Sequence, residues 1–183
     1  MAPHFIAEDA VVATKGLGVV DEFLALKRLA PDRALKVAVP GPLTFATYIA
    51  PGARGADRLL EELGIAVRAE LDALVAAGAD YVQLDEPGLA ERPFGMSFEE
   101  CASIINSTLV GLAGRPLSNR DLAPLVPAIT TLEADEVSVE MANREMAQVE
   151  LLAPLTEAID VAVGVVDVKS FHVETAEQVA QRT

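Results

Sequence analysis

The sequence holds very few of the residues that build disulfides, metal clusters and common nucleophilic sites. Its single cysteine, Cys101, excludes an intramolecular disulfide and a zinc cluster made of cysteines alone. The helical context of Cys101 favours a buried structural thiol. Two histidines, His4 and His172, stand far apart, and no Walker loop, Ser/His/Asp order or His/Cys metal spacing is present. Aromatic residues make up 4% and tryptophan is absent, so alanine, valine and leucine must fill the core.

Long apolar runs and an excess of positive charge are also missing. Charged residues interrupt each apolar stretch before it reaches the roughly 18 residues that a membrane span needs. The N-terminal stretch lacks a basic segment followed by an apolar one, so we expect no signal peptide. A formal net charge of −14 disfavours binding to nucleic acid or to anionic membranes. We therefore expect a cytoplasmic protein whose partners include neither nucleic acid nor a membrane.

The order of helix, glycine turn and strand in the middle of the chain is typical of a parallel α/β protein. Leucine and valine recur three and four residues apart over residues 56–77, which predicts a long helix with one apolar stripe. Gly78 then fits a helix C-cap, and Tyr81 to Leu84 favours a strand that Pro87 closes. Further strands are expected at 5–13, 35–39, 136–140 and 161–169, and further helices at 21–29, 44–49, 97–112, 120–132, 145–158 and 174–182.

The pattern also predicts where one helix begins and how it is joined to the next. Ser97 and Glu100 have the spacing of a capping box, which predicts that a helix begins there. Between that helix and the next, residues 115–118 offer only a turn, although strict alternation of strands and helices requires a strand at this point.

Acidic residues gather where the predicted strands end. Asp85 and Glu86 follow one strand, Glu140 ends another, and Asp167 and Lys169 close a third. Because parallel strands end at the same edge of a sheet, these side chains are expected to lie along one rim, where α/β folds bind ligands. Converging carboxylates can hold an ammonium group, ligate a metal, or divide into a general acid and a general base. Alternatively, each acid caps the following helix or pairs with a nearby cation.

Two further residues remain open between a functional and a structural role. His172 lies just past a predicted strand and can reach the rim, but a turn or solvent-exposed histidine fits as well. Arg54 lies in a flexible connection, where it is either an anion contact or solvated surface.

Four segments in this order resemble the catalytic domain of the cobalamin-independent methionine synthase family, which includes the epoxyalkane:coenzyme M transferases. They are Val39-Pro-Gly-Pro-Leu-Thr44, Gly78-Ala-Asp-Tyr-Val-Gln-Leu-Asp-Glu-Pro87, Ala134-Asp-Glu-Val-Ser-Val-Glu140 and Gly164-Val-Val-Asp-Val-Lys-Ser170. The Gln-Leu-Asp-Glu-Pro element is the most specific of them, and residues 142–145 lean towards the coenzyme M branch.

The resemblance implies a (β/α)8 TIM barrel and zinc-dependent methyl or alkyl transfer to a thiol such as homocysteine, with a 5-methyltetrahydropteroyl donor. Zinc lowers the pKa of a bound thiol and so makes it a nucleophile. By position, Asp85 and Glu86 would bind substrate, with Asp85 receiving the substrate amine, and Glu140 would be a zinc ligand. Residues 1–183 would form a single partial barrel domain, in which about five strands are visible.

The sequence also departs from this family. The His-x-Cys zinc pair belongs at residues 115–118 and is absent, and one carboxylate is fewer than the three protein ligands of a typical catalytic zinc site. Either this is an incomplete version of a full enzyme, or it is a shortened relative that only binds or self-associates, as unpaired strand edges favour. A related decarboxylase is a weaker alternative, because few arginines lie at the strand ends. In either case we expect the 183-residue chain itself to lack zinc-dependent thiol alkylation.

Overall fold

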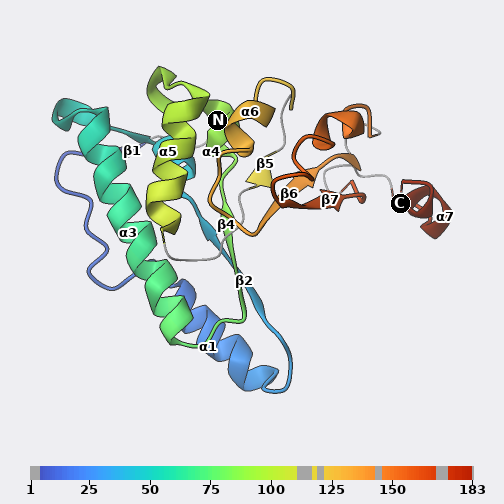
Figure 1. Ribbon diagram of the computed structural model, residues 1–183. Helices are drawn as coiled ribbons and strands as arrows, with labels where there is room; N and C mark the ends of the chain where they lie inside the picture. The colour runs from blue at the N-terminus through green and yellow to red at the C-terminus, as the bar shows by residue number, and fades with distance from the viewer. Residues whose placement is uncertain (1–4, 111–116, 119–121, 143–145, 168–172, 183) are drawn as a thin grey trace.

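Helices and short parallel strands alternate along the chain (Figure 1). The computed structural model describes residues 5–110, 117–118, 122–142, 146–167 and 173–182. The strands are β1 (Phe5–Ile6), β2 (Lys36–Pro40), β3 (Ile49–Ala50), β4 (Tyr81–Asp85), β5 (Leu117–Ser118), β6 (Glu136–Glu140) and β7 (Asp160–Gly164). The α-helices are α1 (Val19–Leu29), α2 (Pro42–Ala46), α3 (Ala56–Ala76), α4 (Gly88–Glu91), α5 (Phe98–Leu109), α6 (Val126–Ile129) and α7 (Ala176–Ala180), and 3-10 turns lie at Gly52–Arg54, Pro93–Gly95 and Val149–Leu152.

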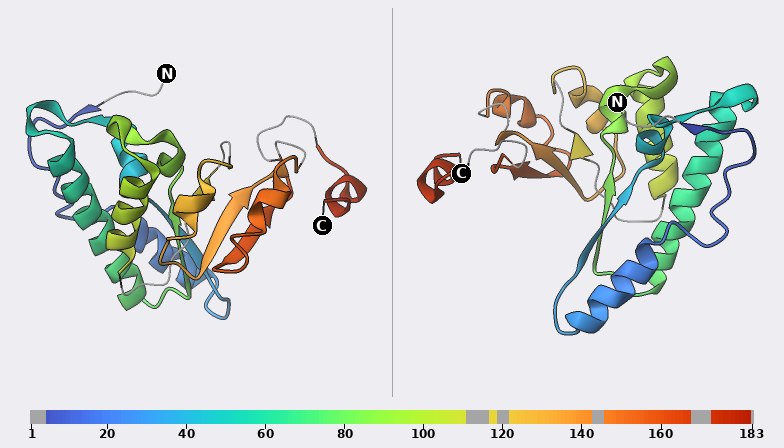
Figure 2. Two further views of the ribbon diagram at one scale, coloured as in Figure 1. Left: turned by 45° about the horizontal axis from the view of Figure 1, so that its top comes forward. Right: turned by 180° about the vertical axis from the view of Figure 1, so that it is seen from behind.

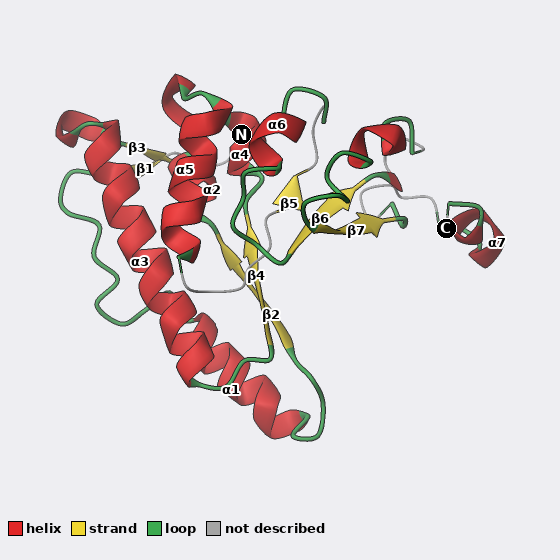
Figure 3. Ribbon diagram, in the orientation of Figure 1, coloured by secondary structure: helices red, strands yellow, loops and turns green. Residues whose placement is uncertain are grey.

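Every strand pair in the described residues is parallel, as the sequence predicts (Figure 3). β2 pairs with β4, β5–β6–β7 form a second group in that order, and β1 pairs with β3. In the described residues these groups do not close into a barrel. The fold is thus α/β with parallel strands, and its loops at the carboxyl ends of β2 and β4 lie together.

The helices cover one side of the β2–β4 pair. Figures 1 and 2 show α3 and α5 side by side there, with α1 beside the C-terminal half of α3, while β5, β6 and β7 extend away on the other side. The side chain of Lys27 links α1 to the end of α3, because its Nζ donates to the carbonyl oxygens of Ala77 and Gly78 at 2.9 and 3.2 Å. None of the described helices is both long and apolar enough to cross a membrane.

The apolar stripe of α3 forms the centre of the core. Its five predicted members are each at most 3% exposed: Leu59, Leu63, Val67, Leu71 and Leu74. They pack in one cluster with Val39 of β2, Leu84 of β4 and Ile105 of α5. Burial of the stripe against the strands fixes α3 behind β4, and so fixes where the carboxyl end of β4 lies.

The prediction of a bare turn at residues 115–118 is wrong. Leu117 and Ser118 form β5, which pairs in parallel with Ser138 and Val139 of β6. The alternation of strands and helices therefore continues through this part of the chain. A strand of two residues is too short to show an alternating pattern, so it cannot be recognised from the sequence.

Two of the predicted helices are much shorter than expected. The helix predicted at 120–132 is limited to α6, with Pro127 in its first turn, and that predicted at 145–158 is limited to a 3-10 turn at Val149–Leu152. Prolines at 124, 127 and 154 explain the difference, because proline has no N–H to donate and is tolerated only in the first turn of a helix. The strand predicted at 5–13 is likewise limited to β1.

Candidate functional site

The carboxyl ends of β2 and β4 lie side by side and present the first two predicted site residues. Pro40 of β2 is paired with Asp85 of β4, and the Gly41 N–H donates to the Asp85 carbonyl at 2.8 Å. Gln83 and Asp85 share one face of β4, and Gln83 Nε2 donates to Asp85 Oδ1. The half-buried Asp85 carboxylate is thereby oriented by an uncharged neighbour.

Gln83 also carries an unusual acceptor. The side chain is 7% exposed, and within the described residues its Oε1 is buried without a hydrogen-bond partner. A buried acceptor without a donor costs about 1–3 kcal/mol. The Gln83–Asp85 pair therefore gathers acceptor oxygens at the end of β4, and the half-buried Asp85 carboxylate is the one that suits a cationic group with several N–H donors.

Glu86 is placed quite differently from Asp85. It is 0% exposed, and its carboxylate accepts hydrogen bonds from the first turn of α2. Oε2 accepts from the Leu43 N–H at 3.1 Å, and Oε1 accepts from the Thr44 N–H at 2.6 Å and from Thr44 Oγ1 at 2.5 Å. Burial raises the pKa of Glu86 to about 7, against the opposing effect of hydrogen bonds from Thr44, Leu43 and Gly88.

Two glycines leave the room that this carboxylate needs. A Cβ on Gly41 would lie 2.0 Å from Glu86 Oε2, and a Cβ on Gly88 would lie 2.4 Å from the carbonyl carbon of Leu43. A side chain at Gly41 would displace the Glu86 carboxylate, whereas a side chain at Gly88 would force apart the turns that follow β2 and β4. Gly88 thus serves a close approach of two backbones.

Glu140 lies at the end of β6, opposite Gly164 of β7. Its Oε1 accepts from the Ala142 N–H at 2.9 Å, so part of the carboxylate closes the turn after its own strand. Asp167 follows β7, and its N–H donates to Glu174 Oε2 at 2.9 Å. Glu174 in turn pairs with Arg182 at 2.5 Å. These acids belong to the β5–β6–β7 group, whereas Asp85 and Glu86 belong to the β2–β4 pair.

The donor set around Glu140 does not fit a zinc site. Among the described residues, no group of three or more His, Cys, Asp or Glu side chains is placed to hold a metal. A catalytic zinc normally has three protein ligands, and β5, where the resembled family would carry its His-x-Cys pair, has Leu117 and Ser118 instead. His4, Arg144, Lys169 and His172 lie outside the described residues.

Several polar residues have structural roles that sequence reasoning missed or left open. Arg54 pairs with the buried Glu62, its Nη2 lying 2.5 Å from Glu62 Oε1, so it is neither an anion site nor solvated surface. That pairing lowers the pKa of Glu62 to about 2. Glu70, 2% exposed, accepts from the Leu17 and Val20 N–H groups at 2.7 and 3.0 Å. Glu62 and Glu70 lie among the apolar positions of α3, and this placement is the sequence feature that indicates their burial.

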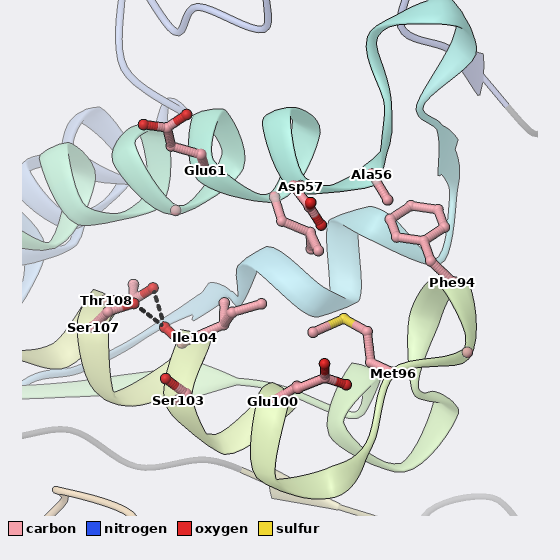
Figure 4. A pocket seen from close by; sticks show the side chains of 13 residues that line it. Ala56, Asp57, Glu61, Phe94, Met96, Glu100, Ser103, Ile104, Ser107 and Thr108 are labelled. Carbon is pink, nitrogen blue, oxygen red and sulfur yellow. Dashed lines mark hydrogen bonds between the residues drawn. The ribbon is translucent and has the colours of Figure 1, made fainter.

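A groove of about 630 Å³ lies between α3 and α5 (Figure 4). Its lining does not include the strand-end residues described above. Asp57 and Glu100 approach it from opposite helices, with Met96 and Phe94 at one end, and none of its lining residues is Asp85, Glu86 or Glu140. The ends of β2 and β4 are the stronger candidate site, because they hold an oriented carboxylate, Asp85, and a buried one, Glu86. Cys101, on the same helix α5, is 0% exposed, as predicted, and burial raises its thiol pKa to about 11.

Comparison with known proteins places the chain beside one enzyme family. Residues 117–183 match the family model described as cobalamin-independent synthase, catalytic domain. The chain is 28% identical over 166 residues to a methionine synthase of Saccharolobus solfataricus, covering 88% of this chain and 49% of that protein. It is 26% identical over 167 residues to a methionine synthase of Pyrococcus furiosus, covering 89% of this chain and 48% of that protein. The chain thus spans about half the length of the curated relatives it matches.

Solved structures agree on the fold. A B12-independent methionine synthase from a Shewanella species, solved in complex with selenomethionine, superposes with a TM-score of 0.79 at 22% identity, covering 96% of this chain and 57% of that one. A putative vitamin-B12 independent methionine synthase from Listeria monocytogenes superposes with a TM-score of 0.66 at 17% identity, covering 89% of this chain and 56% of that one. The family model and the curated relatives, not these structures, confirm the resemblance to the cobalamin-independent methionine synthase family.

Proposed function

We propose that this chain, a relative of the cobalamin-independent methionine synthases, supplies the amino-acid-binding part of a (β/α)8-barrel domain that transfers a methyl or alkyl group to a thiol. Residues 1–183 would form one partial barrel. Homocysteine is the proposed thiol, and a 5-methyltetrahydropteroyl compound is the proposed donor. The observation that carries this proposal is the oriented Asp85 carboxylate at the carboxyl end of β4, next to the unpartnered acceptor of Gln83.

The chemistry of this corner suits an α-ammonium group. Parallel α/β folds bind ligands beyond the carboxyl ends of their strands, where Asp85 lies. An ammonium group has three N–H donors, and the Asp85 carboxylate has acceptor positions besides the one that Gln83 Nε2 occupies. The Shewanella relative is described in complex with an amino acid, selenomethionine, which agrees with an amino-acid ligand.

The proposal assigns Asp85 the direct contact and Glu86 a place behind it. Glu86 was predicted to bind substrate as well, but its carboxylate is fully buried and occupied by Leu43 and Thr44. Zinc is part of the proposed family chemistry, in which it would activate the thiol, and Glu140 remains the candidate ligand. Because the described residues do not complete a zinc site, no step through a metal is derived for this chain.

Calorimetric titration with a pair of matched ligands tests this function. L-Methionine and its analogue without the amino group, 4-(methylthio)butanoate, differ only in the group that Asp85 is proposed to receive. A hydrogen bond to a charged group is worth about 1.5–3 kcal/mol, so the amino acid should bind roughly tenfold to hundredfold more tightly. Asp85→Asn should remove that preference, and Asp32→Asn, an exposed aspartate in a turn, is the matched control. Equal binding of both ligands to the unaltered chain would refute the proposal.

A further inference from the structure

We propose that Glu86 and Thr44 form a positioning pair that sets the main chain of Asp85, so that ligand affinity follows the protonation of Glu86 although Glu86 never contacts the ligand. This inference rests on the proposed function, because Asp85 is the ligand contact there. It deepens that function by assigning the same site a form of regulation.

The Thr44 hydroxyl lies between two acceptor oxygens. Thr44 Oγ1 lies 2.5 Å from Glu86 Oε1 and 3.2 Å from the carbonyl oxygen of Asp85. It also accepts from the Gly88 N–H at 3.3 Å. A hydroxyl has one proton to donate, so it can serve only one of the two acceptors at a time.

The protonation state of Glu86 decides which acceptor the Thr44 hydroxyl serves. When Glu86 is ionised, the Thr44 hydroxyl donates to the Glu86 carboxylate, which is the nearer and charged acceptor. When Glu86 is protonated, its own O–H can donate to Thr44 Oγ1, and the Thr44 proton turns to the Asp85 carbonyl. The proton that Glu86 gains from solvent thus changes the hydrogen bonding of the neighbouring residue in β4.

The fit around this pair is tight. The turns after β2 and β4 are held together by the Leu43 and Thr44 N–H groups on Glu86, and by the Gly41 N–H on the Asp85 carbonyl. At Gly88 the two turns approach closely, because an added Cβ would lie 2.4 Å from the carbonyl carbon of Leu43. A change in the bonding of Thr44 therefore reaches Asp85 through the backbone.

Few other charges act on Glu86. Helix α2 presents the uncharged Leu43 and Thr44 to it, and α5 presents the thiol of Cys101, whose pKa is raised by its burial and also by the Glu86 charge. Glu100 raises and Arg92 lowers the pKa of the same thiol, and Asp85 immediately precedes Glu86 in the chain. No cation within the described residues pairs with Glu86, so its charge state is decided mainly by burial, which raises its pKa to about 7.

The expected direction is tighter binding at higher pH. We assign tighter ligand binding to the arrangement in which the Thr44 hydroxyl donates to ionised Glu86, so that by linkage the ligand favours the ionised form and the ionised form favours the ligand. In the unaltered chain we expect affinity for L-methionine to rise about tenfold between about pH 5 and pH 8, a window that spans the pKa of Glu86. Glu86→Gln should bind with no such dependence, and Thr44→Val should lose it while Thr44→Ser keeps it.

The experiment combines NMR with calorimetry on the full 183-residue chain. The backbone ¹⁵N shifts of Leu43 and Thr44 and the ¹³C carbonyl shift of Asp85 are followed against pH, without ligand, in the unaltered chain and the Thr44 variants. Methionine affinity is then measured across the same pH range, with Glu99→Gln on exposed surface as the matched control for Glu86→Gln. All three shifts should titrate together near the pKa of Glu86 in the unaltered chain and in Thr44→Ser, and the Asp85 shift should stop doing so in Thr44→Val.

The outcomes separate the two proposals. If L-methionine fails to bind at every pH, the proposed function fails, and the ligand part of this inference fails with it. If the ligand binds but the Asp85 carbonyl ignores the titration of Glu86, the positioning role is overturned while the function stands. An affinity that changes with pH equally in Thr44→Val and Thr44→Ser also overturns it, because a merely structural threonine would give that result.

Discussion

Replacing Glu86 by glutamine should change how the stability of the chain depends on pH. The folded pKa of Glu86 is raised from 4.5 to about 7, because burial disfavours the charged form more than the hydrogen bonds from Thr44 and Leu43 favour it. The folded chain therefore keeps this proton to a higher pH than the unfolded chain. The stabilising contribution is complete below the unfolded pKa, decreases as the pH rises from it, and is lost above about pH 7.

The magnitude follows from the size of the shift. One pKa unit corresponds to about 1.4 kcal/mol, so Glu86 should lower the free energy of unfolding by about 3 kcal/mol as the pH rises through this window. Glu86→Gln has no proton to lose. Its stability relative to the unaltered chain should therefore improve by about 3 kcal/mol between low and high pH, whatever its absolute stability.

Urea denaturation followed by far-UV circular dichroism, at constant ionic strength and at several pH values, measures this difference. Subtracting the two chains removes the contribution of the other acidic residues that both share. Glu99→Gln, an exposed glutamate, should show a flat difference. A flat difference for Glu86→Gln, or one that falls with pH, would show that hydrogen bonds to the carboxylate outweigh its burial and would refute the reasoning.

Two further substitutions test the packing around the site. Gly88→Ala should lower the free energy of unfolding by about 2–3 kcal/mol, because its Cβ would lie 2.4 Å from the main chain of Leu43. The control is Gly64→Ala, whose Cβ would meet nothing nearer than Thr108 Oγ1 at 3.7 Å, and which should be neutral or stabilising in the same urea titration. Glu70→Gln should lower the free energy of unfolding by about 1–3 kcal/mol and speed hydrogen exchange at Leu17 and Val20, because an amide has one acceptor oxygen for two N–H donors. The substitution of an exposed residue, Glu61→Gln, is the control, and unchanged exchange at Leu17 and Val20 would contradict the structural role of Glu70.

Much of the fold near the site was predictable because its signals are local. The stripe of α3, the β-branched runs of β2, β4 and β6, and the capping box of Ser97 and Glu100 all have the periodicity or spacing expected of them, and the structure confirms each. β5 leaves no signal because two residues carry no pattern, and α6 is shorter than the apolar pattern predicts because Pro124 and Pro127 limit the helix.

The site was predictable only in part, because sequence shows where carboxylates occur and not what covers them. Asp85 and Glu86 are adjacent in the chain, yet one is half-buried at the strand end and the other is fully buried beneath α2. That difference depends on Leu43 and Thr44, more than forty residues earlier, which donate to Glu86. Long-range contacts of this kind leave no mark on a single sequence.

Locating the binding site of an amino acid tests most directly whether Asp85 receives the ligand. In a ¹H–¹⁵N NMR titration of the full chain with L-methionine, we expect shift changes centred on the ends of β2 and β4, at Gly41, Asp85 and the side-chain amide of Gln83. These changes should be absent in Asp85→Asn. Changes confined to the groove between α3 and α5, with Asp85 unaffected, would contradict the claim.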